Sequence, residues 1–71
     1  MTRNDIEFDV REVALLAIRE KDDEAAHRVE SRLHVDVLRA ISLGALVDIS
    51  PEEAAAMALS TLTIDFARWC A

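Results

Sequence analysis

Four consecutive residues, Ser50-Pro51-Glu52-Glu53, mark the start of a helix more clearly than any other part of the chain does. The Ser50 hydroxyl can accept a hydrogen bond from the amide three residues on, and Glu53 can reach back to the Ser50 amide. Pro51 fits the first helical position, where an N–H is not needed. Apolar residues then recur at alternating spacings of four and three, at Ala55, Leu59, Leu62, Phe66 and Trp69. We therefore predict a helix over residues 51–69.

The middle of this segment also allows a second interpretation. Ser60, Thr61, Thr63 and Ile64 are poor helix formers, and residues 61–64 alternate between polar and apolar as a strand does. We favour the helix because the apolar stripe continues in register to Trp69 and no turn sequence nearby would close a hairpin.

A second helix is predicted over residues 23–43. The acidic run Asp22-Asp23-Glu24 suits a helix start, and Gly44 suits a helix stop. Its inner stripe is expected to comprise Ala26, Val29, Leu33 and Val37, with Ala40 and Ile41 beside it. Glu30, Arg32 and Asp36 are expected to point outward. Residues 44–49 then form a short loop whose Leu46 and Ile49 contact the core.

The first helix is predicted over residues 5–21, with Asp9 and Glu12 as a possible cap pair. Two patterns compete at its beginning. Ile6, Phe8 and Val10 alternate with acidic residues, as in a short strand. A helical stripe of Ile6, Val10, Val13 and Ala17 covers the same stretch, and we favour it.

These three segments predict an all-α, single-domain protein over residues 1–71. A domain this short gains little stability from its own core, so it often needs a disulfide, a metal, oligomerisation or very regular helix packing. One cysteine, Cys70, cannot form an intramolecular disulfide. A single thiol, charged and polar residues among the first ten and short apolar runs predict a cytoplasmic protein without a signal peptide or membrane span.

Residues that could carry chemistry are few. Cys70 lies near a helix C-terminus, where the helix dipole disfavours the thiolate, and the single glycine excludes a glycine-rich phosphate loop. His27 and His34 are two helical turns apart, about 10.5 Å. Glu24 and His27 have the Glu-x-x-His spacing of di-metal four-helix proteins, but a solvated polar face explains them better. That face is expected to comprise Glu20, Glu24, His27, Ser31 and His34. We predict no enzymatic activity, no metal and no cofactor.

The net charge of −6 argues against nucleic-acid binding, because lysine and arginine supply most of the affinity for phosphate. Ala40 and Gly44 before a loop and a capped helix weakly resemble a helix-turn-helix motif, but the loop is long and the second helix begins with two glutamates. The acidic run 20–24 could contact a basic partner, but we favour the interpretation in which it solvates a helix junction and caps the next helix. Seven arginines against one lysine, with abundant alanine, are typical of a GC-rich genome such as that of an actinobacterium or its phages.

Each predicted helix carries more apolar residues than one inward stripe can use. Residues outside the stripes include Leu15 and Ile18, then Val35, Leu38 and Leu43, then Met57 and Ile64. A monomer would expose an unusually large apolar patch, whereas a two-fold dimer would bury it in a six-helix bundle. We predict a homodimer whose interface comprises Val35, Leu38, Met57, Leu62, Phe66 and Trp69. Trp69 fits the core and an interface equally well.

The apolar residues outside the inward stripes also indicate a function. We expect a small acidic protein-interaction module, of a phage or actinobacterial accessory or regulatory kind, that self-associates and binds a protein partner. The alternative is a dimeric transcription regulator or antitoxin with a degenerate helix-turn-helix. In that case DNA contact would come from scattered arginines, namely Arg3, Arg11, Arg28, Arg32 and Arg39.

Overall fold

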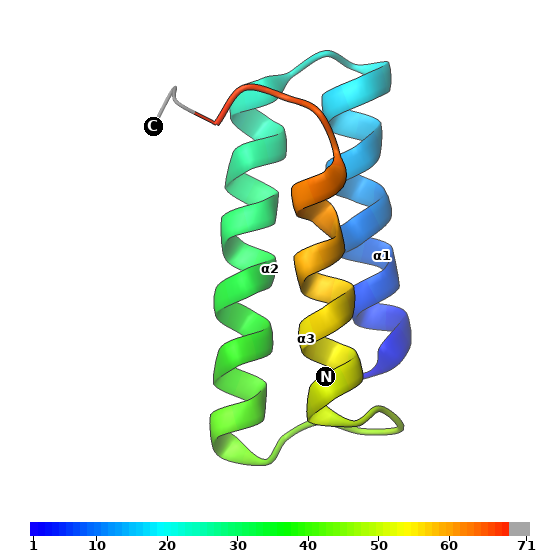
Figure 1. The fold of residues 1–71 in the computed structure, drawn as a ribbon, viewed down its shortest axis with the longest axis vertical. Coiled ribbons are helices and arrows are strands. Elements are labelled where there is room, and N and C mark those ends of the chain that lie inside the picture. The colour runs from blue at the N-terminus through cyan, green and yellow to red at the C-terminus, as the bar shows by residue number, and fades with distance from the viewer. Residues whose placement is uncertain (69–71) are drawn as a thin grey trace.

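Three helices pack side by side in an up-down-up arrangement in the computed structural model, which describes residues 1–68 (Figure 1). The helices are α1 (Arg3–Ala14), α2 (Asp23–Leu43) and α3 (Pro51–Leu59). A π-helical turn, η1 (Leu15–Arg19), continues α1, and a 3-10 turn, η2 (Ser60–Thr63), continues α3. The predicted all-α architecture is therefore confirmed.

The first helix begins earlier than predicted. Thr2 and Asp5 form a reciprocal cap, in which the Asp5 amide donates to the Thr2 hydroxyl and the Thr2 amide donates to the Asp5 carboxylate (3.2 and 2.9 Å). The proposed Asp9–Glu12 cap is wrong, and so is the strand alternative for residues 6–10. A cap at Asp9 would have left Ile6, which is fully buried, outside the helix. The helical path also ends at Arg19 rather than at Lys21, which has a positive φ of 53°.

The second helix matches its predicted bounds at both ends. The Asp22 carboxylate accepts a hydrogen bond from the Ala25 amide (3.0 Å), so this acidic residue acts as the N-cap. Gly44 adopts the left-handed conformation at φ +63°, which ends the helix without steric cost. The following loop packs Leu46 and Ile49 against the core, as predicted.

The third helix starts where predicted but is much shorter. The Ser50 hydroxyl accepts from the Glu53 amide (3.1 Å), which confirms the cap. Regular helix nevertheless ends at Leu59, η2 ends at Thr63 and residues 64–68 form neither helix nor strand, so the predicted helix to residue 69 is wrong, as is a strand at 61–64. The hydroxyls of Ser60, Thr61 and Thr63 each donate to the carbonyl three residues earlier and compete with the helical ladder.

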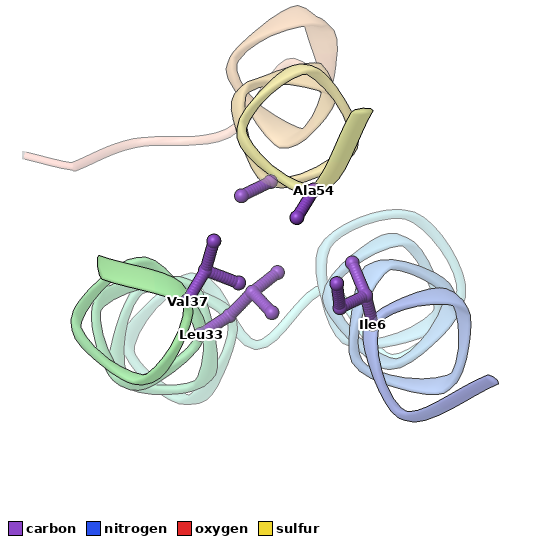
Figure 2. Packing of buried hydrophobic residues seen from close by; sticks show 5 residues of the cluster. Ile6, Leu33, Val37 and Ala54 are labelled. Atoms are coloured by element: carbon purple, nitrogen blue, oxygen red, sulfur yellow. The ribbon is translucent and has the colours of Figure 1, made fainter. Parts of the chain in front are cut away.

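Two small clusters form the core. Figure 2 shows Ile6, Leu33, Val37 and Ala54 converging from the three helices, and Ala58 completes this cluster. Val13, Ala17 and Ala26 form the second cluster, which Ile64 and Phe66 of the C-terminal segment cover. The stripes predicted for the first two helices are confirmed.

The predicted inner stripe of the third helix is wrong by one position. Ala54, Ala58 and Thr61 face the core, while Leu59 and Leu62 are 57% and 55% exposed. Small side chains let α3 approach the other two helices closely, which displaces the leucines to the surface.

Candidate interaction surface

An apolar groove of about 210 Å³ runs between α2 and α3. Its lining comprises His34, Val37, Leu38, Ala55, Ala58 and Leu59. Leu38 and Leu59 stand on opposite sides of the groove and are 66% and 57% exposed. The groove therefore presents apolar side chains to any molecule that approaches this side of the bundle.

Further exposed side chains extend the groove along both helices. Val35 lies three residues before Leu38, and Leu62 lies three residues after Leu59. At this spacing each pair lies on one side of its helix. We call the groove together with Val35 and Leu62 the α2/α3 face. Contiguous exposed apolar surface of this kind is characteristic of binding sites rather than of inert surface.

The six residues predicted for the interface fall in different places. Val35, Leu38 and Leu62 belong to the α2/α3 face. Met57 is half-buried against the first core cluster, and Phe66 is half-buried against the second. Trp69 lies outside the described residues, as does Cys70. Sequence reasoning missed Leu59 because its spacing had assigned it to the core stripe.

His34 joins α2 to the end of α3 at the groove. Its Nε2 atom lies 2.9 Å from the Ala58 carbonyl oxygen and 3.0 Å from the Thr61 hydroxyl. Because a carbonyl can only accept, Nε2 carries the hydrogen of that contact. The prediction that His34 belongs to a fully solvated polar face is therefore wrong, since it connects two elements.

A partly buried ion pair holds residue 68 against α2 beside this histidine. Arg68 donates to the two carboxylate oxygens of Glu30 through Nε and Nη2, at 2.8 and 3.0 Å. Glu30 is 3% exposed, so the prediction that it points outward is wrong. Burial alone would raise the pKa of Glu30, but hydrogen bonds from Arg68 and the positive charge of Arg68 outweigh burial and lower it.

The arginines proposed for DNA contact are mostly engaged with carboxylates. Within residues 1–68, the ion pairs of these arginines are Arg3–Glu53, Arg11–Glu7, Arg32–Asp9 and Arg39–Asp36. Glu52 and Glu53 are exposed in the first turn of α3, the helix that would enter a DNA groove. Both features oppose contact with phosphates.

Neither a metal site nor a membrane-spanning helix is found in the part of the chain that the structure describes. No group of three or more histidine, cysteine, aspartate or glutamate side chains is arranged to hold a metal ion among residues 1–68. In the same range, no helix combines the length and the apolar character that crossing a membrane requires. No protein-family model, curated protein or solved structure matches the chain.

Proposed function

We propose that this protein is a small protein-interaction module that self-associates through the α2/α3 face. One observation carries the proposal. Among residues 1–68, nine large apolar side chains are at least 45% exposed, whereas four side chains larger than alanine form the apolar core. The five other core residues are alanines. Ten more large apolar side chains are partly buried against this core. Even so, nine exposed ones leave a large apolar area available for contact with another molecule.

A second copy suits the α2/α3 face in area and symmetry. A standard interface buries roughly 800 Å² per partner, about a sixth of this chain's surface of 4601 Å². In a two-fold dimer the same face meets itself, so Leu38 of each copy is placed to enter the groove of the other. Full burial of one leucine contributes about 1.5–3 kcal/mol, and four branched side chains on each copy share the interface.

Sedimentation equilibrium over a dilution series tests the proposal. We expect the wild-type protein to sediment as a dimer that dissociates on dilution, and we expect Leu38→Glu to be monomeric throughout. Leu43→Glu is the matched control, because Leu43 is also on α2 and is 72% exposed but does not line the groove. A wild-type monomer at every concentration, or equal effects of the two substitutions, contradicts the proposal.

A further inference from the structure

A second apolar hollow lies on α1, away from the α2/α3 face. It has a volume of about 350 Å³ and is lined by Arg11, Ala14, Leu15, Ile18 and Arg19. Figure 2 shows Ile6 pointing from α1 toward the other helices, and Val13 and Ala17 are buried as well. Leu15 and Ile18 are 45% and 64% exposed, so this hollow is on the outer side of the bundle.

The hollow coincides with the π-helical turn. In η1 the Glu20 amide donates to the Leu15 carbonyl at 2.9 Å, five residues back, so the turn is wider than an α-helical turn. Such turns are rare and occur often at functional sites. Phe8, 62% exposed and seven residues before Leu15, lies on the same side of α1, with Arg11 and Glu12 one turn after it. The surface from Phe8 to Ile18 is about 15 Å long, the length of three turns of a partner helix.

The charges around this hollow differ from those of the whole protein. The chain carries a net charge of −6, yet the charged residues that line the hollow are two arginines. Arg19 makes no ion pair within residues 1–68. Arg11 contacts Glu7 at 3.6 Å, but 74% of its side chain is exposed, so the pair is weak and open to exchange. Apolar surface framed by exposed cations is complementary to apolar surface framed by carboxylates.

We propose that this hollow, lined by Arg11, Leu15, Ile18 and Arg19, docks an amphipathic helix of another protein whose apolar stripe is flanked by aspartate or glutamate. The apolar stripe of the partner covers Leu15 and Ile18, and its carboxylates pair with the two arginines. This surface is separate from the α2/α3 face, so self-association and partner docking can fail independently.

Two synthetic helical peptides test the proposal by fluorescence anisotropy with the full chain. They share one leucine stripe and differ only in flanking glutamates or lysines. We expect the glutamate peptide to bind about ten-fold more tightly, the ratio that reversing two screened charge pairs produces. The net charge of the protein alone would give the opposite order. Equal binding, or tighter binding of the lysine peptide, overturns the proposal.

Variants locate the effect. Arg11→Glu with Arg19→Glu is expected to reverse the preference, and Arg11→Gln with Arg19→Gln to abolish it, while Leu38→Glu leaves it unchanged. Circular dichroism checks that each variant folds. If the double glutamate variant does not fold, the double glutamine variant still tests the proposal. A preference that survives both arginine variants overturns the proposal. So does conversion of a wild-type dimer to monomer by Ile18→Glu, because a second copy would then cover this hollow.

Discussion

The contact between Glu30 and Arg68 joins the segment after η2 to α2. A buried carboxylate is costly unless its lone pairs are satisfied, and here one guanidinium occupies both oxygens. The same guanidinium donates to the carbonyls of Thr61 and Ile64 at 3.0 Å and lies 3.8 Å from the centre of the Phe66 ring. One side chain therefore holds η2 and residues 64–68 against α2.

Removing Arg68 should destabilise the fold. Arg68→Ala leaves Glu30 buried without a partner, and we expect the free energy of unfolding to fall by about 2 kcal/mol, below the full cost of a fully buried pair because Arg68 is 30% exposed. Arg39→Ala is the control. Its contact with Asp36 is 3.7 Å long at the surface, so its cost should stay under about 0.5 kcal/mol. Urea unfolding measures both, and equal losses would contradict the prediction.

Stability should depend on pH in opposite directions at Glu30 and Asp9. The folded pKa of Glu30 lies below its ordinary 4.5, so its contribution is present above pH 4.5 and is lost as pH falls through the folded pKa. Burial raises the pKa of Asp9 above 3.8 despite Arg32 at 3.6 Å, so ionised Asp9 destabilises the fold at neutral pH and this penalty disappears toward pH 3.8.

Thermal unfolding of wild type, Glu30→Gln and Asp9→Asn between pH 7 and pH 3 measures these contributions. We expect the advantage of wild type over Glu30→Gln to shrink on acidification. As the pH falls over the same range, the thermal stability of wild type should rise relative to that of Asp9→Asn. Parallel curves for the two variants would show that neither carboxyl group has the environment described for it.

At the scale of elements, the predictable features are those that depend on neighbouring residues. Ser50 and Asp22 cap α3 and α2 through contacts three residues away, and Gly44 ends α2 through its own backbone. Thr2 and Asp5 have the same three-residue spacing, so their cap was also visible in the sequence, although Asp at that position is a weaker signal than Glu. The end of α3 was not predictable from periodicity, because hydroxyl-to-carbonyl bonds decided it.

The register of α3 depended on the other two helices. Ala55, Leu59 and Leu62 form a stripe of larger side chains, whereas the buried positions are Ala54, Ala58 and Thr61. Periodicity identifies both stripes, and residue size favoured the wrong one. The space left between α1 and α2 admits only small side chains, which no local pattern reveals.

Substitutions at adjacent stripes of α3 should distinguish the two registers. Ala54 is fully buried, so Ala54→Leu overpacks the first core cluster and should cost about 1–3 kcal/mol of unfolding free energy. Leu59→Gln, at an exposed position, should change it by less than about 0.5 kcal/mol when measured on dilute monomer. Chemical denaturation followed by circular dichroism provides both values. A larger loss for Leu59→Gln than for Ala54→Leu would restore the register that sequence periodicity favoured.

At the scale of the molecule, an excess of apolar residues was visible in the sequence, but their arrangement was not. Val35 and Leu38 lie outside the inner stripe of α2, so their exposure could be predicted. Met57 and Phe66 also lay outside or at the end of a stripe, yet Met57 packs on the first core cluster from within α3, and Phe66 packs on the second from the segment after η2. The hollow on α1 includes a π-helical turn that no sequence pattern predicted.

Self-association should couple stability to protein concentration. If unfolding separates a dimer into two chains, each ten-fold rise in concentration adds about 1.4 kcal/mol, which corresponds to a rise in Tm of roughly 4–5 °C for two chains of this length. We expect this slope in wild type and in Leu43→Glu, and a flat line in Leu38→Glu. Calorimetry from low to high micromolar protein measures it. A flat line in wild type would mean that the exposed leucines of the α2/α3 face are tolerated in a stable monomer, and their binding partner would then have to be a different molecule.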